Sequence, residues 1–218
     1  MPALDRRPIA ARSHPLAQAV AAALVRRDVS ANSISIFGLF CGVAAGLAFA
    51  ATRWAVEAAA ILWFGGAVLV QLRLAANMFD GMVALARRIP SPVGELYNEI
   101  PDRLSDSAVL IGAGFAGGNW GLGVAAALAA MGTAYVRAAG KAAGAPNDFS
   151  GPMAKPHRMF LMTALALWSS LAPREWQPVM AGLELPSIAL IVVTLGCVFT
   201  MLRRLRRIAE ALRQGGGA

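Results

Sequence analysis

The residues most suited to chemistry in this chain are polar side chains that recur at helical spacing inside an apolar sequence. The first set shares one helix face, because its members are three, four and seven residues apart: Asn77, Asp80, Gly81 and Ala84. The second set recurs at every fourth residue: Gly94, Asn98, Asp102 and Asp106. The proline-containing turn at 87–92 would bring the two stripes face to face. Facing oxygen-rich stripes in a helical bundle predict a site for a hard cation such as Mg²⁺ or Mn²⁺.

The helices that position these stripes belong to a membrane protein. The chain has 218 residues, of which 57% are hydrophobic and 15% charged, which is too apolar for an ordinary soluble domain. We predict an all-α protein with six membrane spans, at about 34–51, 54–76, 94–117, 122–136, 159–171 and 186–202. The fifth of these is short, and its helix is expected to start earlier, around Pro156. Either Pro101 kinks the third span, or the regular helix begins only at about Glu99.

The two ends of the chain differ from this apolar middle. Residues 15–27 combine apolar side chains with a cationic end and predict an amphipathic helix at the membrane surface. A solvated helix packed on the bundle is the alternative. We therefore divide the chain into an interfacial segment at 1–30, a six-span domain at 31–207 and a flexible cytoplasmic tail at 208–218.

Basic residues indicate the orientation of the spans. They gather in the N-terminal segment, at 87–103, at 137–158 and at the C-terminus, whereas the opposite turns hold Arg53 and Arg174. By the positive-inside rule, both termini and the acidic stripes are cytoplasmic. The net charge of +8 does not indicate nucleic-acid binding, because the arginines flank apolar runs. Arg73 lies within an apolar run and is expected to snorkel to the interface, with pairing to an acid as the alternative.

The spacing of the two stripes resembles the signature of the CDP-alcohol phosphotransferases, D-x2-D-G-x2-A-R-x8-G-x3-D-x3-D, over its whole length. The residues that match it are Asp80, Gly81, Ala84, Gly94 and Asp102. The departures are Asn77 for the first Asp, Leu85 for the Arg and Asn98 for the third Asp. Asn at the first and third positions resembles a variant subgroup of bacterial inner-membrane relatives.

The resemblance implies a role for each of these positions. Members of the family hold metal ions at the first three acids and use the fourth as the general base. The implied metal ligands here are Asn77, Asp80, Asn98 and Asp102, with Glu99 and Asp106 as additional candidates. Asp102 is the implied catalytic base, and the implied walls of the nucleotide pocket are Gly81, Ala84 and Gly94. Two amides in place of two carboxylates weaken a two-metal site or reduce it to one ion, and lower or altered activity is expected.

A second group of residues resembles the acceptor-binding segments of bacterial members that use phosphorylated alcohols. These residues lie in Ala134-Tyr-Val-Arg137 and in Gly151-Pro-Met-Ala-Lys155-Pro-His-Arg158. Arg137, Lys155 and Arg158 would form a cationic cup for an acceptor phosphate. Anchoring to anionic headgroups is the alternative. Arg87 or Arg88 could replace the signature arginine that is missing at Leu85.

The sequence therefore predicts a multi-pass enzyme of the bacterial inner membrane with the CDP-alcohol phosphotransferase fold. It would transfer a phosphatidyl group from a CDP-linked lipid such as CDP-diacylglycerol to an alcohol or phosphorylated-alcohol acceptor, releasing CMP in phospholipid synthesis. Mg²⁺ or Mn²⁺ is the implied cofactor, and a homodimer is the implied assembly. A non-catalytic relative that binds nucleotide or lipid, or that supports a partner enzyme, is the alternative. An ion-coupled transporter is disfavoured, because the acids cluster at one end and form no path across the membrane.

Overall fold

The computed structural model describes residues 10–87 and 93–215 of the chain. Seven α-helices carry the fold: α1 Pro15–Arg26, α2 Ala31–Ala51, α3 Ala59–Arg87, α4 Gly94–Ala116, α5 Trp120–Ala142, α6 Lys155–Leu171 and α7 Leu185–Gly215. Short 3-10 turns precede α1 and α3 and follow α6, at Ala10–Ser13, Val56–Ala58 and Arg174–Trp176. A small hairpin of β1 (Val179–Met180) and β2 (Leu183–Glu184) leads into α7. The expected all-α architecture is confirmed.

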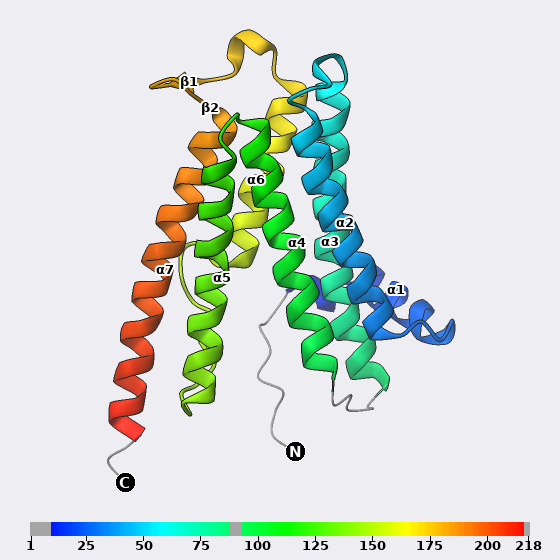
Figure 1. Ribbon diagram of the computed structural model, residues 1–218. Coiled ribbons are helices and arrows are strands. Elements are labelled where there is room, and N and C mark those ends of the chain that lie inside the picture. The colour runs from blue at the N-terminus through cyan, green and yellow to red at the C-terminus, as the bar shows by residue number, and fades with distance from the viewer. Residues whose placement is uncertain (1–9, 88–92, 216–218) are drawn as a thin grey trace.

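Helices α2 to α7 run roughly along one axis and form a bundle (Figure 1). Within it, α2 contacts α3 and α4, α5 contacts α4 and α7, and α6 contacts α3 and α7. The core is apolar and contains fully buried Phe49, Val70, Leu110, Met162 and Leu190. The beginning of α4 and the ends of α3, α5 and α7 lie at the same end of the bundle (Figure 1). The two polar stripes on α3 and α4 are therefore near that end.

Four stretches are long and apolar enough to cross a membrane: Ala31–Ala51, Val56–Arg87, Trp120–Ala142 and Leu185–Gln214. Because these four lie along the bundle, the chain is a multi-pass membrane protein. The helix α4 carries its acids in its first half, and α6 has only 17 residues. The count of six spans therefore stays a prediction.

Several predicted boundaries differ from those of the structure. The last helix continues to Gly215, so residues 208–215 are helical rather than a flexible tail, and residues 216–218 lie outside the described part of the chain. The helix α4 begins at Gly94 and includes Pro101, which excludes a start at Glu99. The helix α6 begins at Lys155, close to the start around Pro156 that the sequence predicted for it.

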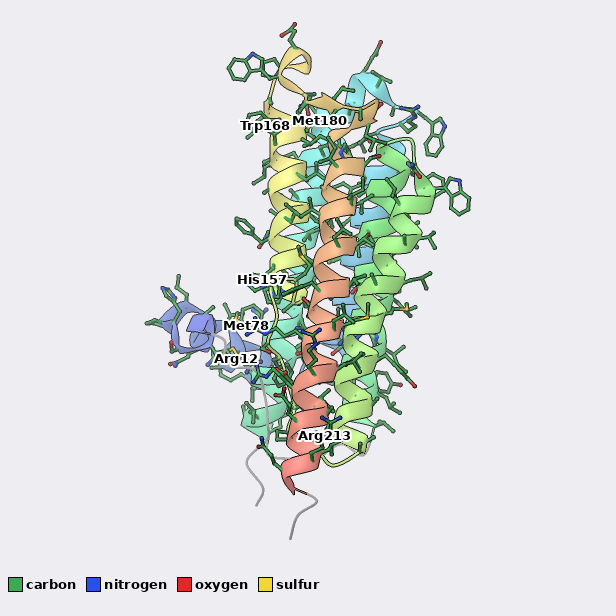
Figure 2. All side chains as sticks on the ribbon, turned by 90° about the vertical axis from the view of Figure 1, so that its left-hand side faces the viewer. Arg12, Met78, His157, Trp168, Met180 and Arg213 are labelled. Atoms are coloured by element: carbon green, nitrogen blue, oxygen red, sulfur yellow. The ribbon has the colours of Figure 1, made fainter. Side chains whose placement is uncertain are left out.

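The helix α1 lies across the bundle, at the level where Figure 2 labels Met78. The buried residues of α1 are Ala17 and Ala21, so the face that it packs against the bundle is narrow. Leu16 and Val20 are 71% and 44% exposed and can meet lipid. An amphipathic helix was predicted here, and the helix packs on α3 while keeping an exposed apolar face.

The segment between α5 and α6 is packed against α7. Met153 N donates to Thr200 Oγ1 at 3.1 Å, and Arg204 Nε donates to the Ser150 carbonyl at 2.9 Å. Burial raises the pKa of Asp148, but hydrogen bonds from Ser150 and the charges of Arg207 and Arg204 outweigh it, so this pKa lies below its ordinary value. The segment brings the start of α6 to mid-height of the bundle, where Figure 2 labels His157.

The helices α2 and α4 approach closely at glycines. A Cβ on Gly112 would overlap the main-chain carbonyl of Gly46, whereas a Cβ on Gly65 would meet nothing within 4 Å. Gly112→Ala is therefore expected to lower the free energy of unfolding by about 1–3 kcal/mol, because the added methyl separates the two helices. Denaturant unfolding in detergent measures this change, with Gly65→Ala as the matched control. Equal stability of the two variants would contradict the predicted contact.

Candidate active site

The four signature positions line one small cavity between α2, α3 and α4. Asn77 and Asp80 come from α3, and Asn98 and Asp102 come from α4. The remaining lining residues are Ser35, Gly38, Leu39, Arg73, Pro101 and Ser105. Of the eight residues in the two predicted stripes, these four line the cavity, whereas Gly81, Ala84, Gly94 and Asp106 are not among its lining residues.

Asp80 is the most buried of the four signature residues in the cavity. Its residue is 5% exposed, and its Oδ2 accepts a hydrogen bond from Ser35 Oγ at 2.7 Å. Ser35 lies in the second turn of α2. The N-cap of this helix is Ser30, whose side chain accepts a hydrogen bond from Ser33 N at 3.0 Å. In the described part of the chain, Asp80 has no ion-pair partner within 4 Å. Its negative charge is therefore available to a ligand in the cavity.

Asp102 is held by cations from two other helices. Arg73 Nη2 of α3 donates to Asp102 Oδ1 at 2.6 Å, and Lys155 of α6 forms an ion pair with the same oxygen. Arg103 lies farther away, with Nη2 at 3.7 Å from Asp102 Oδ2. The Asp102 side chain keeps 10% of its surface exposed and lines the cavity. It is a carboxylate of fixed orientation beside the other signature positions.

Asp106 has a different environment although it lies one turn farther along α4. It pairs with Arg73 and, at 3.3 Å, with Arg158 Nη2 of α6. Both arginines are only 1% exposed, so the three side chains form a buried cross-brace between α3, α4 and α6. The expectation that Arg73 snorkels to the interface is wrong, because its guanidinium turns inward to two carboxylates.

Glu99, the other additional metal candidate, also turns to arginines. Its carboxylate accepts from Arg103 at 2.6 Å and from Arg137 at 2.7 Å. Arg137 further donates to Asn147 Oδ1 at 3.3 Å and lies 5.2 Å from the ring centroid of Phe149. Glu99 and Asp106 are not among the residues that line the cavity.

The three residues of the predicted cationic cup all reach α4, but each pairs with a different acid. Lys155 binds Asp102, Arg158 binds Asp106, and Arg137 binds Glu99. The side chains of Lys155 and Arg137 are 17% and 13% exposed, whereas that of Arg158 is 2% exposed. Two of the cations can therefore meet a ligand directly, while Arg158 braces the structure.

The remaining predicted positions lie on the expected helices. Gly81 and Ala84 are half-buried on α3, and Gly94 is the first residue of α4. Arg87 does not turn toward the cavity: it pairs with Asp28 at 2.8 Å and donates to the Val29 carbonyl at 3.1 Å. Arg88 lies outside the described residues.

Comparison with known proteins identifies the family of the chain. No family profile matches it. A phosphatidylinositol phosphate synthase of Mycobacteroides abscessus is 31% identical over 181 residues, which cover 79% of this chain and 76% of that protein. The chain belongs to the CDP-alcohol phosphotransferase family.

Solved structures show the same fold. A crystal structure of Mycobacterium tuberculosis phosphatidylinositol phosphate synthase with CDP-DAG bound superposes with a TM-score of 0.70 at 22% identity, covering 89% of this chain and 94% of that one. A structure of that synthase with manganese and citrate gives a TM-score of 0.70 at 21% identity, covering 88% of each chain. The CDP-alcohol phosphotransferase fold expected from the signature is confirmed.

The residues at the signature positions of this CDP-alcohol phosphotransferase fit a divalent metal ion. All of them offer oxygen, which suits Mg²⁺ or Mn²⁺, and Asp80 supplies a buried carboxylate with a neutral hydroxyl as its side-chain partner. In the described ranges 10–87 and 93–215, no group of three or more His, Cys, Asp and Glu residues could hold a metal by itself. A metal ion held at Asp80 would therefore use the amide oxygens of Asn77 and Asn98 as further ligands.

Sequence reasoning missed two polar residues of this site. Ser35 is on the cavity wall, and the hydroxyl-rich stretch Ser30-Ala-Asn-Ser-Ile-Ser35 was the signal that could have indicated it. Ser105 accepts from Arg73 Nε at 3.0 Å, directly beside Asp102. Arg73 itself was noticed, but its pairing depends on how α3 and α4 align.

Proposed function

We propose that this chain transfers the phosphatidyl group of CDP-diacylglycerol to a hydroxyl acceptor and releases CMP. The observation that carries the proposal is the meeting of Asn77, Asp80, Asn98 and Asp102 in one cavity. Family membership and the name of the relative, a phosphatidylinositol phosphate synthase, support the same reaction. The site lies on a multi-pass membrane protein, where a lipid donor is available.

The reaction forms one bond and breaks one. The acceptor oxygen bonds to the phosphorus that carries the diacylglycerol group, and the phosphoanhydride bond from that phosphorus to CMP breaks. The proton of the acceptor hydroxyl passes to a base, and the bond electrons leave with CMP. Asp102 is the proposed base, because its carboxyl group lines the cavity beside the other signature positions. Arg73 of α3 and Lys155 of α6 fix its orientation.

The donor's phosphates need positive charge and oxygen-rich surroundings. We assign Asp80, Asn77 and Asn98 to hold a divalent ion, which when bound neutralises the charge on the phosphates of the donor. Gly81, Ala84 and Gly94 are proposed to border the nucleotide, since small residues let a ligand approach the helix backbone.

We propose an acceptor that carries its own phosphate. Arg137, Lys155 and Arg103 are partly exposed cations beside Asp102 and Glu99, with 13%, 17% and 23% of their side chains exposed, and arginine binds phosphate through paired donors. Because the 31% identical relative is a phosphatidylinositol phosphate synthase, inositol phosphate is the first acceptor to test.

Arg137→Leu is expected to raise the KM for the phosphorylated acceptor by about tenfold or more, because one charge-assisted contact is lost. The KM for CDP-diacylglycerol should change little. Initial rates at varied acceptor concentration measure this split, with Arg53→Leu at the exposed Glu184 pair as the matched control. An unchanged acceptor KM in Arg137→Leu would remove this residue from the acceptor site.

We further propose that both termini and the site face the cytoplasm of a bacterial inner membrane and that the chain forms a homodimer. The ends of α3, α5 and α7 share one end of the bundle, and the last helix carries Arg203, Arg204, Arg206 and Arg207 there (Figure 1). This concentration of arginine follows the positive-inside rule.

The reaction is tested with purified protein in lipid vesicles, supplied with CDP-diacylglycerol and either inositol phosphate, glycerol phosphate or unphosphorylated alcohols. We expect CMP release that requires Mg²⁺ or Mn²⁺ and stops on chelation. The two amides at signature positions favour the second candidate, a relative that binds donor without turnover. Donor binding without CMP release from any acceptor would support that candidate and contradict the enzyme.

A further inference from the structure

Arg73 is a buried cation between two carboxylates of α4. Its side chain is 1% exposed, its Nη2 lies 2.6 Å from Asp102 Oδ1, and the same nitrogen pairs with Asp106. It also donates from Nε to Ser105 Oγ at 3.0 Å and from Nη2 to the Asp102 carbonyl at 3.1 Å. Four acceptors on one helix therefore fix the guanidinium next to a signature position.

Two more cations complete this arrangement. Lys155 pairs with Asp102, and Arg158 Nη2 lies 3.3 Å from Asp106 Oδ2. The carboxylates of Asp102 and Asp106 are thus neutralised by residues of the chain itself. Asp80 differs, because in the described part of the chain its side chain contacts the neutral hydroxyl of Ser35 and no cation within ion-pair distance.

We propose that Arg73 takes the place of a second divalent ion, so that each site of this enzyme holds a single Mg²⁺ or Mn²⁺ on its Asp80 side. This inference rests on the proposed transferase function. A second ion between Asp102 and Asp106 would meet the guanidinium at close range, and like charges repel strongly in a buried site. The ligands left for one ion are Asp80 and the amides Asn77 and Asn98.

The charges of the site agree with one ion. In the described part of the chain, four carboxylates in and around the site stand beside five cations: Asp80, Glu99, Asp102 and Asp106 beside Arg73, Arg103, Arg137, Lys155 and Arg158. A single divalent ion then adds positive charge that the donor can match, since its two phosphates carry about one negative charge each. The neutral amides of Asn77 and Asn98 fit the lower metal charge.

Counting bound ions tests the inference. Purified protein in lipid nanodiscs is titrated with Mn²⁺, and the free ion is measured by electron paramagnetic resonance. We expect one Mn²⁺ per chain in the wild type and none in Asp80→Asn. Two ions per chain would overturn the single-ion site and leave the transferase function standing. No bound ion in the presence of donor would contradict the proposed metal-dependent function as well.

The double variant Asn77→Asp, Asn98→Asp separates the effect of Arg73 from that of the amides. It retains Arg73 and restores two carboxylates, so we expect one ion bound at least about tenfold more tightly, because ligand charge increases affinity. Two bound ions in this variant would show that the amides, and not Arg73, set the number of ions.

Arg73→Met tests the guanidinium itself. We expect a lower midpoint of thermal unfolding, because two buried carboxylates lose a partner, and we expect Mn²⁺ to restore most of the loss by binding in the vacated position. The matched control is Arg204→Met, since Arg204 is also buried but donates to the carbonyls of Ser150 and Thr133. An equal Mn²⁺ effect on both variants would contradict the proposal. If Arg73→Met does not fold, the ion counts in the wild type and in the double variant decide.

Discussion

Asp102→Asn is expected to reduce CMP release by about 10²–10⁴-fold, which is the contribution of a general base. The amide keeps the shape of the side chain and can still accept the hydrogen bond that Arg73 donates at 2.6 Å. It cannot take the proton of the acceptor hydroxyl. The measurement is kcat at saturating CDP-diacylglycerol and acceptor, alongside a thermal unfolding curve for the same preparation.

The matched control for Asp102→Asn is Glu184→Gln, which makes the same chemical change at an exposed ion pair with Arg53 near the other end of the bundle. This variant should retain the wild-type rate. If Asp102→Asn remains folded and turns over at the wild-type rate, Asp102 is not the base.

Asp106→Asn is expected to damage the fold rather than the reaction step. In the described part of the chain, the change leaves the buried guanidinium of Arg158 without a carboxylate partner. It also removes one of the two carboxylates that pair with Arg73. Breaking a buried ion pair from one side costs about 3–5 kcal/mol, so the free energy of unfolding should fall by an amount of this order. Urea or guanidinium unfolding in detergent measures the loss.

Asp28→Asn is the matched control for Asp106→Asn. Asp28 also pairs with an arginine, Arg87, but its side chain is 91% exposed, and exposed ion pairs contribute little to stability. Its positive φ of 56° is tolerated by asparagine. Equal losses in the two variants would contradict the difference between a buried brace and a surface pair.

The sequence predicted the centre of the site because helical spacing is a local property. Residues three or four apart on α3 and α4 share a face whatever the rest of the chain does, and so Asn77, Asp80, Asn98 and Asp102 were predicted to meet. The all-α fold followed from long apolar runs in the same way. Four of those runs meet the length and apolarity of a membrane span in the structure.

The partners of the charged residues could not be predicted, because they depend on how helices align. Arg73 meets Asp102 and Asp106 only because α3 and α4 pack at a particular height. Glu99 was predicted as an additional metal candidate, yet its carboxylate turns to Arg103 and to Arg137 of α5, which is 38 residues away. A single sequence contains no direct signal for such long-range contacts.

The segment between α5 and α6 gives a second example. The predicted spans left residues 137–158 as a connection, but they did not indicate that it would lie along α7 through hydrogen bonds with Thr200 and Arg204. This packing places Lys155 beside Asp102 and Arg158 beside Asp106. These two cations of the predicted acceptor cup therefore lie at the site, where each forms an ion pair with an acid of α4.

The transfer step is tested most directly by following the acceptor oxygen. An acceptor labelled with ¹⁸O at its attacking hydroxyl is incubated with CDP-diacylglycerol, the divalent ion and the wild-type protein, and both products are analysed by mass spectrometry. Attack of that hydroxyl on the phosphatidyl phosphorus predicts ¹⁸O in the lipid product, none in CMP, equal amounts of the two products and little of either with Asp102→Asn. CMP formed without a labelled lipid would contradict the proposed transfer.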